Sequence, residues 1–206
     1  MNKGFLIVIS GAAGSGKGTI VRKLAGNSND FHTSISYTTR APRGDDIPDV
    51  TYHFVTVEKF KEMIANDEFA EYAIYRENFY GTPMLELDEP LREGKNVILE
   101  IDTHGALQIK KHYPEAIMIW ITPPDYETLE RRLRARATNT EDDILKRLAT
   151  SQKELQLLDY YDYIIVNNDG EADKAADQIR QILRVKQLSV ASNKDFHHTF
   201  YKTNNH

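Results

Sequence analysis

The stretch GAAGSGKGT, from Gly11 to Thr19, follows directly on the apolar run FLIVIS and decides the expected fold. Four of its nine residues are glycines, and Lys17 carries its only charge. A strand, a glycine-rich turn and a helix start place backbone N–H groups around an anion. Gly11, Gly14 and Gly16 permit a close approach and a positive φ. We therefore predict a phosphate-binding loop whose lysine reaches the phosphates, rather than an ordinary strand-to-helix turn.

One position of this loop departs from the usual pattern. A serine or threonine normally follows the lysine and binds a metal ion, whereas here Gly18 follows Lys17 and Thr19 comes one place later. Thr19 faces about 100° further round the helix, which makes it a poor substitute. We predict that Mg²⁺ has no direct side-chain ligand and is bound by nucleotide phosphates and by waters. Glu100 or Asp102 would hold those waters.

Length, charge and cysteine content set the limits on what the chain can be. It has 206 residues, a formal net charge of −5 and no cysteine. The length suits one α/β domain with insertions. The negative charge argues against nucleic acid and anionic membranes as partners, and the lack of cysteine excludes thiolate chemistry. No signal-peptide pattern or membrane-length apolar run is present, so we expect a cytoplasmic protein.

Four short apolar runs, at 5–10, 96–101, 116–121 and 161–167, read as buried strands. Helical patterns lie between and after them, at 17–24, 105–112, 126–136, 143–158 and 172–188. Strands that alternate with helices predict an α/β fold, with a parallel sheet covered by helices on both faces.

One segment interrupts this alternation. SISYTTR and TYHFVTV alternate as strands, VEKFKEMIANDEF reads as a helix, and EYAIYRENFYGTP reads as a strand ending in a turn. We interpret 35–83 as a small α/β insertion, the arginine-rich stretch 126–147 as a mobile lid, and 189–206 as a frayed polar tail. The core then consists of residues 1–34, 84–125 and 148–188.

The loop SYTTRAPR, at 36–43, carries two arginines among hydroxyl groups. Arg40 and Arg43 are three residues apart, and guanidinium groups suit phosphate oxygens. Tyr52 and Tyr80 could add phenolic donors. Taken alone, such a short run would equally fit a solvated basic loop.

Three acids form a second group. Glu71 lies in the insertion, whereas Glu100 and Asp102 end the second core strand and should share one face by strand alternation. Ligands of open α/β sheets bind at this end of the strands. Acids here could order Mg²⁺ through water or accept hydrogen bonds from N1–H and the 2-amino group of guanine. A hydroxyl such as Ser36 or Thr82 suits guanine O6, and the alternative is a set of solvated carboxylates.

The third group is a run of arginines in the expected lid, namely Arg131, Arg132, Arg134, Arg136 and Arg147. Arg132 and Arg136 are four residues apart, on one helical face. Phosphoryl transfer needs positive charge around the moving group, and a closing lid supplies it while excluding water. The alternative is an exposed charged helix paired with its own acids.

Taken together, these motifs resemble the guanylate kinase family, especially its bacterial members. They follow in order over about residues 4–185: the phosphate loop, SISYTTRAPR, YHF, FAEYA, NFYGTP, LEIDTHGA, ITPP, RRLRAR and KRL. The resemblance implies a P-loop nucleoside monophosphate kinase fold with a GMP-binding insertion and a lid. The implied reaction transfers a phosphoryl group from ATP to GMP, giving ADP and GDP, with Mg²⁺ as cofactor.

The resemblance also implies a role for individual residues. The catalytic group comprises Lys17, Arg132, Arg136 and Arg147. The ATP-binding group comprises Gly11, Ala12, Ala13, Gly14, Ser15, Gly16, Lys17, Gly18, Thr19 and Asn167. The guanine of GMP is placed against Ser36, Glu71, Thr82 and Asp102, and its phosphate against Arg40, Arg43, Tyr52 and Tyr80.

Two other functions stay open. One is a related P-loop kinase of a sugar phosphate such as ribose bisphosphate, against which the acids Glu71 and Asp102 argue, since a sugar phosphate has no base edge to read. The other is a non-catalytic guanylate-kinase-like binding module, a class that typically loses the loop lysine and glycines that are retained here as Lys17 and Gly16. The expected substrates are ATP and GMP, with use of dGMP and the choice between monomer and homodimer left open.

Overall fold

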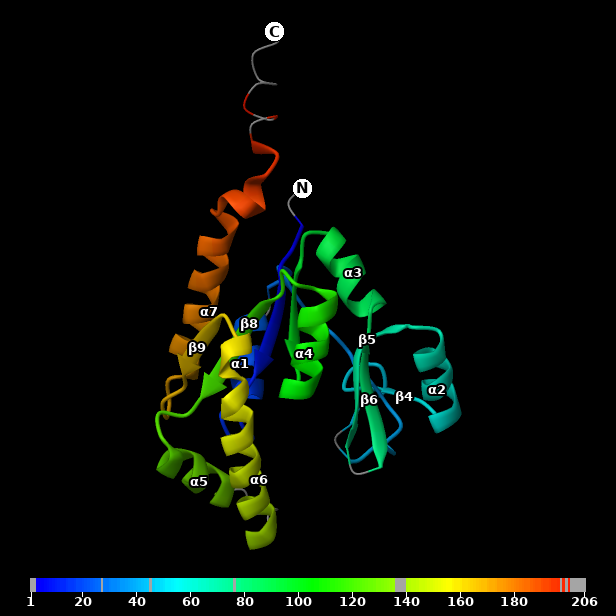
Figure 1. The fold of residues 1–206 in the computed structure, drawn as a ribbon, viewed down its shortest axis with the longest axis vertical. Coiled ribbons are helices and arrows are strands. Elements are labelled where there is room, and N and C mark those ends of the chain that lie inside the picture. Colours follow the sequence, from blue (N-terminus) through cyan, green and yellow to red (C-terminus); the bar gives the residue numbers. More distant parts are fainter. Residues whose placement is uncertain are drawn as a thin grey trace.

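The computed structural model describes residues 3–26, 28–44, 46–75, 77–135, 140–196, 198 and 200. Its centre is a five-stranded sheet with the strand order β2-β7-β1-β8-β9 (Figure 1). All neighbouring strands in this sheet run parallel, as predicted. In spatial order the strands are Phe31–Thr33 (β2), Asn96–Glu100 (β7), Leu6–Ser10 (β1), Ile117–Thr122 (β8) and Tyr163–Val166 (β9).

Two helices cover one face of this sheet. Ile7 and Ile9 of β1 pack in one buried cluster with residues of α1 (Lys17–Ala25) and α7 (Ala172–Gln187). Both isoleucines are fully buried, and successive strand side chains alternate between the two faces. The cluster therefore fixes the start of α1 at the carboxyl end of β1.

Two other helices cover the opposite face. Leu6 and Val8 of β1 pack in a second cluster with α3 (Leu85–Arg92) and α4 (Thr103–His112). Apolar positions on both faces explain why the strand sequences are continuous hydrophobic runs. The prediction of helices on both faces is confirmed.

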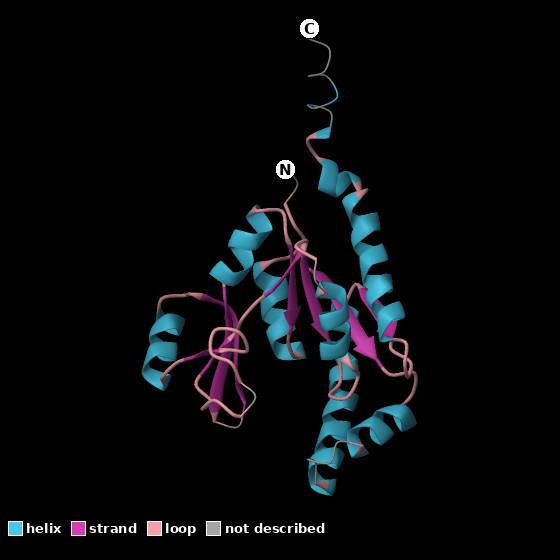
Figure 2. Cartoon of the chain, turned by 180° about the vertical axis from the view of Figure 1, so that it is seen from behind, coloured by secondary structure: helices cyan, strands magenta, loops and turns pink. Residues whose placement is uncertain are grey.

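The insertion forms a second sheet with the order β4-β3-β6-β5 (Figure 2). Its elements are β3 (Tyr37–Thr38), β4 (His53–Phe54), α2 (Val57–Ala65), β5 (Phe69–Tyr75) and β6 (Asn78–Pro83). The small core depends on Phe60 of α2, which is fully buried and stacks on Phe69 at 4.4 Å between ring centroids.

The stretch EYAIYRENFYGTP was expected to form one strand, and this is wrong. It contributes to two antiparallel strands, β5 and β6, joined by a turn in which Glu77 has a φ of 66°. A positive φ at a residue other than glycine is uncommon, so the sequence gives little warning of this turn.

Two further elements were not predicted. Strand β2 has only three residues, too few to show a period. Helix α3 contains Pro90 near its end, and proline normally argues against a helix interior.

The expected lid contains α5 (Tyr126–Arg134) and the first half of α6 (Glu141–Glu154). Leu129 and Leu133 of α5 pack against Ala12 of the phosphate loop, so this helix is docked on the core. Helix α6 gives way to the 3-10 helix η1 (Leu155–Tyr160), where a single longer helix was expected.

Beyond α7 the chain continues away from the body of the molecule (Figure 1), through the 3-10 helix η2 (Val190–Asn193). No helix within the described ranges is both long and apolar enough to cross a membrane.

The aromatic core of the insertion can be tested by stability measurements. Phe60→Ala should lower the free energy of unfolding by about 3–5 kcal/mol, because it leaves a cavity beside two other rings. Ile74→Ala, on an exposed position of the same sheet, should change it by less than about 0.5 kcal/mol. Urea titration measures both, and equal effects would show that this cluster does not hold the insertion together.

Candidate active site

The phosphate loop has the backbone that its glycines predict. Gly11, Gly14 and Gly16 all have a positive φ, and Gly16 directly precedes the first turn of α1. The ammonium of Lys17 donates hydrogen bonds to the carbonyl oxygens of Gly11 and, at 3.1 Å, Ala12. A positive group is therefore held against the glycine-rich loop at a helix N-terminus, an arrangement that suits phosphate.

A cavity of 270 Å³ opens beside this loop, between the start of α1 and the end of β7. Arg22 of α1 and Glu100 of β7 line it together with Gly18 and Thr19. The hydroxyl of Thr19 accepts a hydrogen bond from Arg22 Nη2 at 3.2 Å. Thr19 therefore faces Arg22 in this structure.

Glu100 occupies the space beside the glycine that replaces the usual hydroxyl residue. A Cβ atom added to Gly18 would lie 3.3 Å from Glu100 Oε2. Burial raises the pKa of Glu100, whereas the positive charges of Lys17 and Arg22 act to lower it. This carboxylate thus faces the phosphate loop, in a position from which it can hold a cation or its water.

Asp102 has different neighbours. Strand β7 ends at Glu100, and Asp102 is the N-cap of α4, with its Oδ1 accepting from Gly105 N at 2.8 Å. Asp102 therefore belongs to the start of α4, and a face shared with Glu100 stays a prediction. Asp102 lies within electrostatic reach of Glu71 in the insertion.

Within the insertion, Glu71 and Thr82 are buried and form a polar set with the half-buried Ser36. Glu71 is 6% exposed, and its Oε1 accepts a hydrogen bond from Thr82 Oγ1 at 2.6 Å. Thr82 Oγ1 also lies 3.3 Å from Ser36 Oγ. Glu71 reaches this position because residue 105 is glycine: a Cβ at Gly105 would lie 2.7 Å from Glu71 Oε2.

The environment of Glu71 favours its neutral form. Burial raises the pKa of Glu71 to about 7, and the negative charge of Asp102 adds to this effect, while the Thr82 hydrogen bond opposes it. A carboxyl group whose pKa lies near neutrality is a candidate for a functional role.

Arg40 and two tyrosines meet at the other end of the insertion. The guanidinium of Arg40 lies 5.5 Å from the ring centroid of Tyr52, whose ring is 6.0 Å from that of Tyr80. Asp46 forms an ion pair with Arg40 Nη1 at 2.9 Å and also accepts from the backbone N–H of Arg43 at 2.7 Å. The side chain of Arg43 is exposed, so only its backbone joins this group closely.

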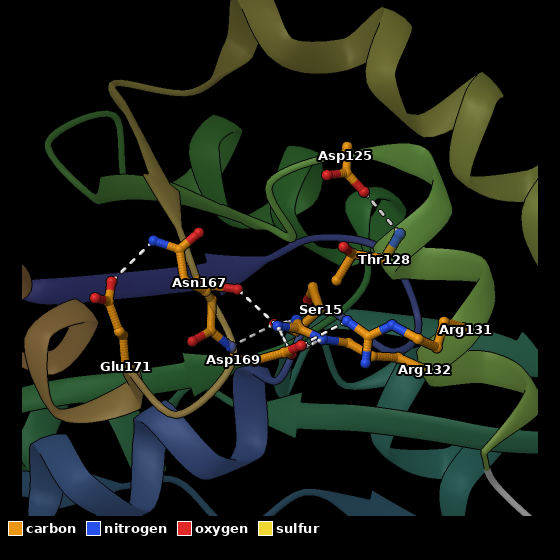
Figure 3. Close-up of polar contacts among 9 residues, drawn as sticks. Ser15, Asp125, Thr128, Arg131, Arg132, Asn167, Asp169 and Glu171 are labelled. Atoms are coloured by element: carbon orange, nitrogen blue, oxygen red, sulfur yellow. Dashed lines mark hydrogen bonds and ion pairs between the residues drawn. The ribbon is translucent and has the colours of Figure 1, made fainter.

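Asn167 connects strand β9 to the phosphate loop. Its Nδ2 donates to the carbonyl oxygen of Ser15 at 2.8 Å, and the residue is 6% exposed. Arg132 of α5 donates to the backbone oxygen of Asn167 at 2.8 Å and to Asp169 at 2.7 Å (Figure 3). These contacts lie against a second cavity, of 320 Å³, on the far side of the loop.

Of the other two predicted catalytic arginines, only Arg147 can be placed relative to this contact network. Arg136 lies outside the described residues. Arg147 is half-buried on α6 and makes no hydrogen bond or ion pair with any other residue that the structure describes.

Sequence reasoning missed three residues of the site, namely Arg22, Asp46 and Asp169. Asp46 follows Arg43 by three residues, a spacing that permits a local side-chain-to-backbone bond and could have suggested its place. Asp169 comes two residues after Asn167, but its partners on α5 are distant in sequence.

A comparison with protein families matches this chain to the guanylate kinase model over residues 3–186. The chain belongs to the guanylate kinase family. It is 41% identical to the guanylate kinase of Caldanaerobacter subterraneus, with 95% of this chain and 94% of that protein covered. It is 44% identical to the guanylate kinase of Carboxydothermus hydrogenoformans, with 91% of each chain covered.

A solved structure agrees with this assignment. The crystal structure of guanylate kinase from Anaplasma phagocytophilum has a TM-score of 0.72 to this chain at 32% identity. The match covers 91% of this chain and 88% of the other. The family fold expected from the sequence is therefore confirmed.

The raised pKa of Glu71 predicts how the stability of this guanylate kinase depends on pH. The folded protein holds the Glu71 proton more tightly than the unfolded chain, whose pKa is near 4.5. This contribution is complete below about pH 4.5 and is lost as the pH rises through about 7. Between about pH 5 and about pH 8, the wild type should therefore lose about 2–3 kcal/mol of unfolding free energy relative to Glu71→Gln. Urea unfolding at both pH values measures this difference, and parallel pH dependences would contradict the prediction.

Proposed function

We propose that this chain transfers the terminal phosphoryl group of ATP to GMP and releases ADP and GDP. The observation that carries the proposal is the buried pair of Glu71 and Thr82, with the half-buried Ser36 beside it, on an insertion next to a phosphate-binding loop. A carboxylate and hydroxyls suit a guanine edge, whereas a phosphate would prefer cations.

In the proposed complex, the carboxylates of Glu71 and Asp102 accept from N1–H and the 2-amino group of guanine. Thr82 or Ser36 donates to O6. Since burial raises the pKa of Glu71 to about 7, guanine binding favours loss of its proton, and GMP affinity should increase as the pH rises through this range. Adenine lacks the pair of donors and would leave a buried carboxylate without a partner.

The phosphate of GMP would bind to Arg40, with Tyr52 and Tyr80 as donors beside it and the exposed Arg43 closing from the rim. Asp46 holds Arg40 in the free protein at 2.9 Å. Its carboxylate keeps the guanidinium extended beside the two rings, and an incoming phosphate would share or replace this contact.

On the other side, the phosphate loop would hold the ATP phosphates. Residues 11–19 supply backbone N–H groups, Lys17 supplies charge on the transferring group, and Asn167 holds the loop at Ser15. Arg132, with Arg136 and Arg147 when the lid closes, would balance the charge that develops during in-line transfer. No side-chain base is needed, because the accepting phosphate oxygen is already anionic.

The residues around Gly18 fit a Mg²⁺ ion held largely by the nucleotide. Among the described residues, no cluster of three or more His, Asp or Glu side chains could bind a metal ion by itself. Mg²⁺ keeps several waters readily, and Glu100 faces the place where the usual hydroxyl is absent. We propose that Glu100 binds a water of the ion, with Asp102 further away. When bound, Mg²⁺ would neutralise charge on the phosphates.

The two other functions are less consistent with these observations. A sugar phosphate offers no edge for the buried Glu71. A non-catalytic binding module does not require a lysine at the phosphate loop, whereas Lys17 is held there by hydrogen bonds to the loop backbone. The cytoplasm remains the expected location, and the choice between monomer and homodimer remains open.

The acceptor preference tests the proposed reaction most simply. ADP release should be fast with GMP and slower by about 10³-fold or more with AMP, CMP or UMP, because none of those bases offers the adjacent N1–H and 2-amino donors that Glu71 and Asp102 would accept. Glu71→Gln should lose most of this preference. A coupled assay with all four nucleotides measures it, and preference for AMP or for a ribose bisphosphate would contradict the proposal.

The proposed metal contact can be tested by binding. Glu100→Gln should weaken Mn²⁺ binding to the complex with a non-hydrolysable ATP analogue by about tenfold. Gly18→Ser in that background should restore part of the loss, because it returns a hydroxyl to the loop. Electron paramagnetic resonance of Mn²⁺ gives both affinities, and unchanged affinity in Glu100→Gln would remove this residue from the metal site.

A further inference from the structure

Two segments that are distant in sequence meet at one carboxylate, next to the phosphate loop. Asp169, in the loop between β9 and α7, accepts from Arg132 Nε at 3.1 Å and from Arg132 Nη2 at 2.7 Å, both at Oδ1. Its other oxygen, Oδ2, accepts from Arg131. Figure 3 shows the two arginines of α5 converging on Asp169, beside Asn167 and Ser15.

These contacts use one edge of the Arg132 guanidinium and leave the other directed at the phosphate loop. Nε and Nη2 are taken by Asp169 and by the backbone oxygen of Asn167. Nη1 lies 3.5 Å from the carbonyl oxygen of Ser15, too far for a strong bond. Arg132 thus keeps donors available at the loop, on the wall of the 320 Å³ cavity.

The same carboxylate holds α5, the first helix of the expected lid. The side chain of Arg132 is only 16% exposed, whereas that of Asp169 is 57% exposed. Hydrogen bonds from Arg132 and Arg131 lower the pKa of Asp169, so it stays ionised at neutral pH. Leu129 and Leu133 pack the apolar side of α5 on the phosphate loop. Asp169 binds the two arginines on its polar side.

We infer that Asp169 is a positioning residue for ATP, which holds Arg132 against the phosphate loop before the nucleotide binds. This inference rests on the proposed function of the loop as the ATP site. A guanidinium that is already oriented loses less freedom on binding a phosphate, and this preorganisation increases affinity. Arg132 is then already in place in the ATP site before the nucleotide binds, even though it belongs to the expected lid.

Arg132 differs in this respect from Arg147 of the expected lid. Arg132 has its orientation fixed by a carboxylate and a backbone oxygen, whereas Arg147 has no such partner among the described residues. Removing Asp169 releases Arg131 as well, but that side chain is 60% exposed and is not among the residues lining the cavity. ATP binding should therefore change through Arg132, and the GMP side should stay unchanged.

The test compares two variants that each remove one carboxylate from an arginine pair. Asp169→Asn is the variant, and Asp177→Asn is the control, because Asp177 pairs with Arg180 at 2.7 Å on α7 and is similarly exposed at 64%. Titration calorimetry with a non-hydrolysable ATP analogue should give about fivefold to tenfold weaker binding for Asp169→Asn and less than about twofold for the control. The Kd for GMP should be the same in both.

The second part of the test compares Asp169→Asn in the wild type with Asp169→Asn in an Arg132→Ala background. If Asp169 acts through Arg132, then adding Asp169→Asn to Arg132→Ala should weaken analogue binding no further. Independent, additive losses would overturn the inference, as would unchanged or tighter binding in Asp169→Asn. Analogue binding needs no acceptor, so a wild type that binds the analogue but does not phosphorylate GMP would count against the proposed function and not against Asp169.

Discussion

The phosphate loop lies so close to the carboxyl ends of the central strands that polar side chains from those strands fill the space beside its glycines. A Cβ on Gly16 would lie 2.3 Å from Asn167 Nδ2, and one on Gly18 would lie 3.3 Å from Glu100 Oε2. Because Gly16 and Gly18 have no side chains, Asn167 and Glu100 can occupy the space beside the loop. The conformation of the loop therefore depends on contacts with the ends of these strands.

A similar approach joins the insertion to the core. Gly105 at the start of α4 leaves room for Glu71, and Asp102, the N-cap of the same helix, adds negative charge nearby. Gln108 of α4 brackets the backbone of Tyr72 on β5 with two hydrogen bonds, of 3.1 Å and 2.9 Å. Glu71 is thus buried by contact between two parts of the chain, and this burial is the main cause of its raised pKa.

The core of the fold could be predicted from the sequence, because buried parallel strands are apolar on both faces and leave a direct pattern. The hairpin of β5 and β6 could not, because its turn depends on a positive φ at Glu77. Within the site, Lys17 follows from the loop motif alone, whereas Asn167 is reached only through the resemblance to a family. Asp169 could not be predicted, since an acid on a loop gives no sign of arginines that are 37 and 38 residues away along the chain.

The most direct test of the account is a crystal structure of this chain with GMP bound. The account predicts that the guanine lies against Glu71 and Thr82, with its phosphate on Arg40 between Tyr52 and Tyr80. A base bound away from Glu71, or a GMP phosphate seated in the loop over Lys17, would contradict it.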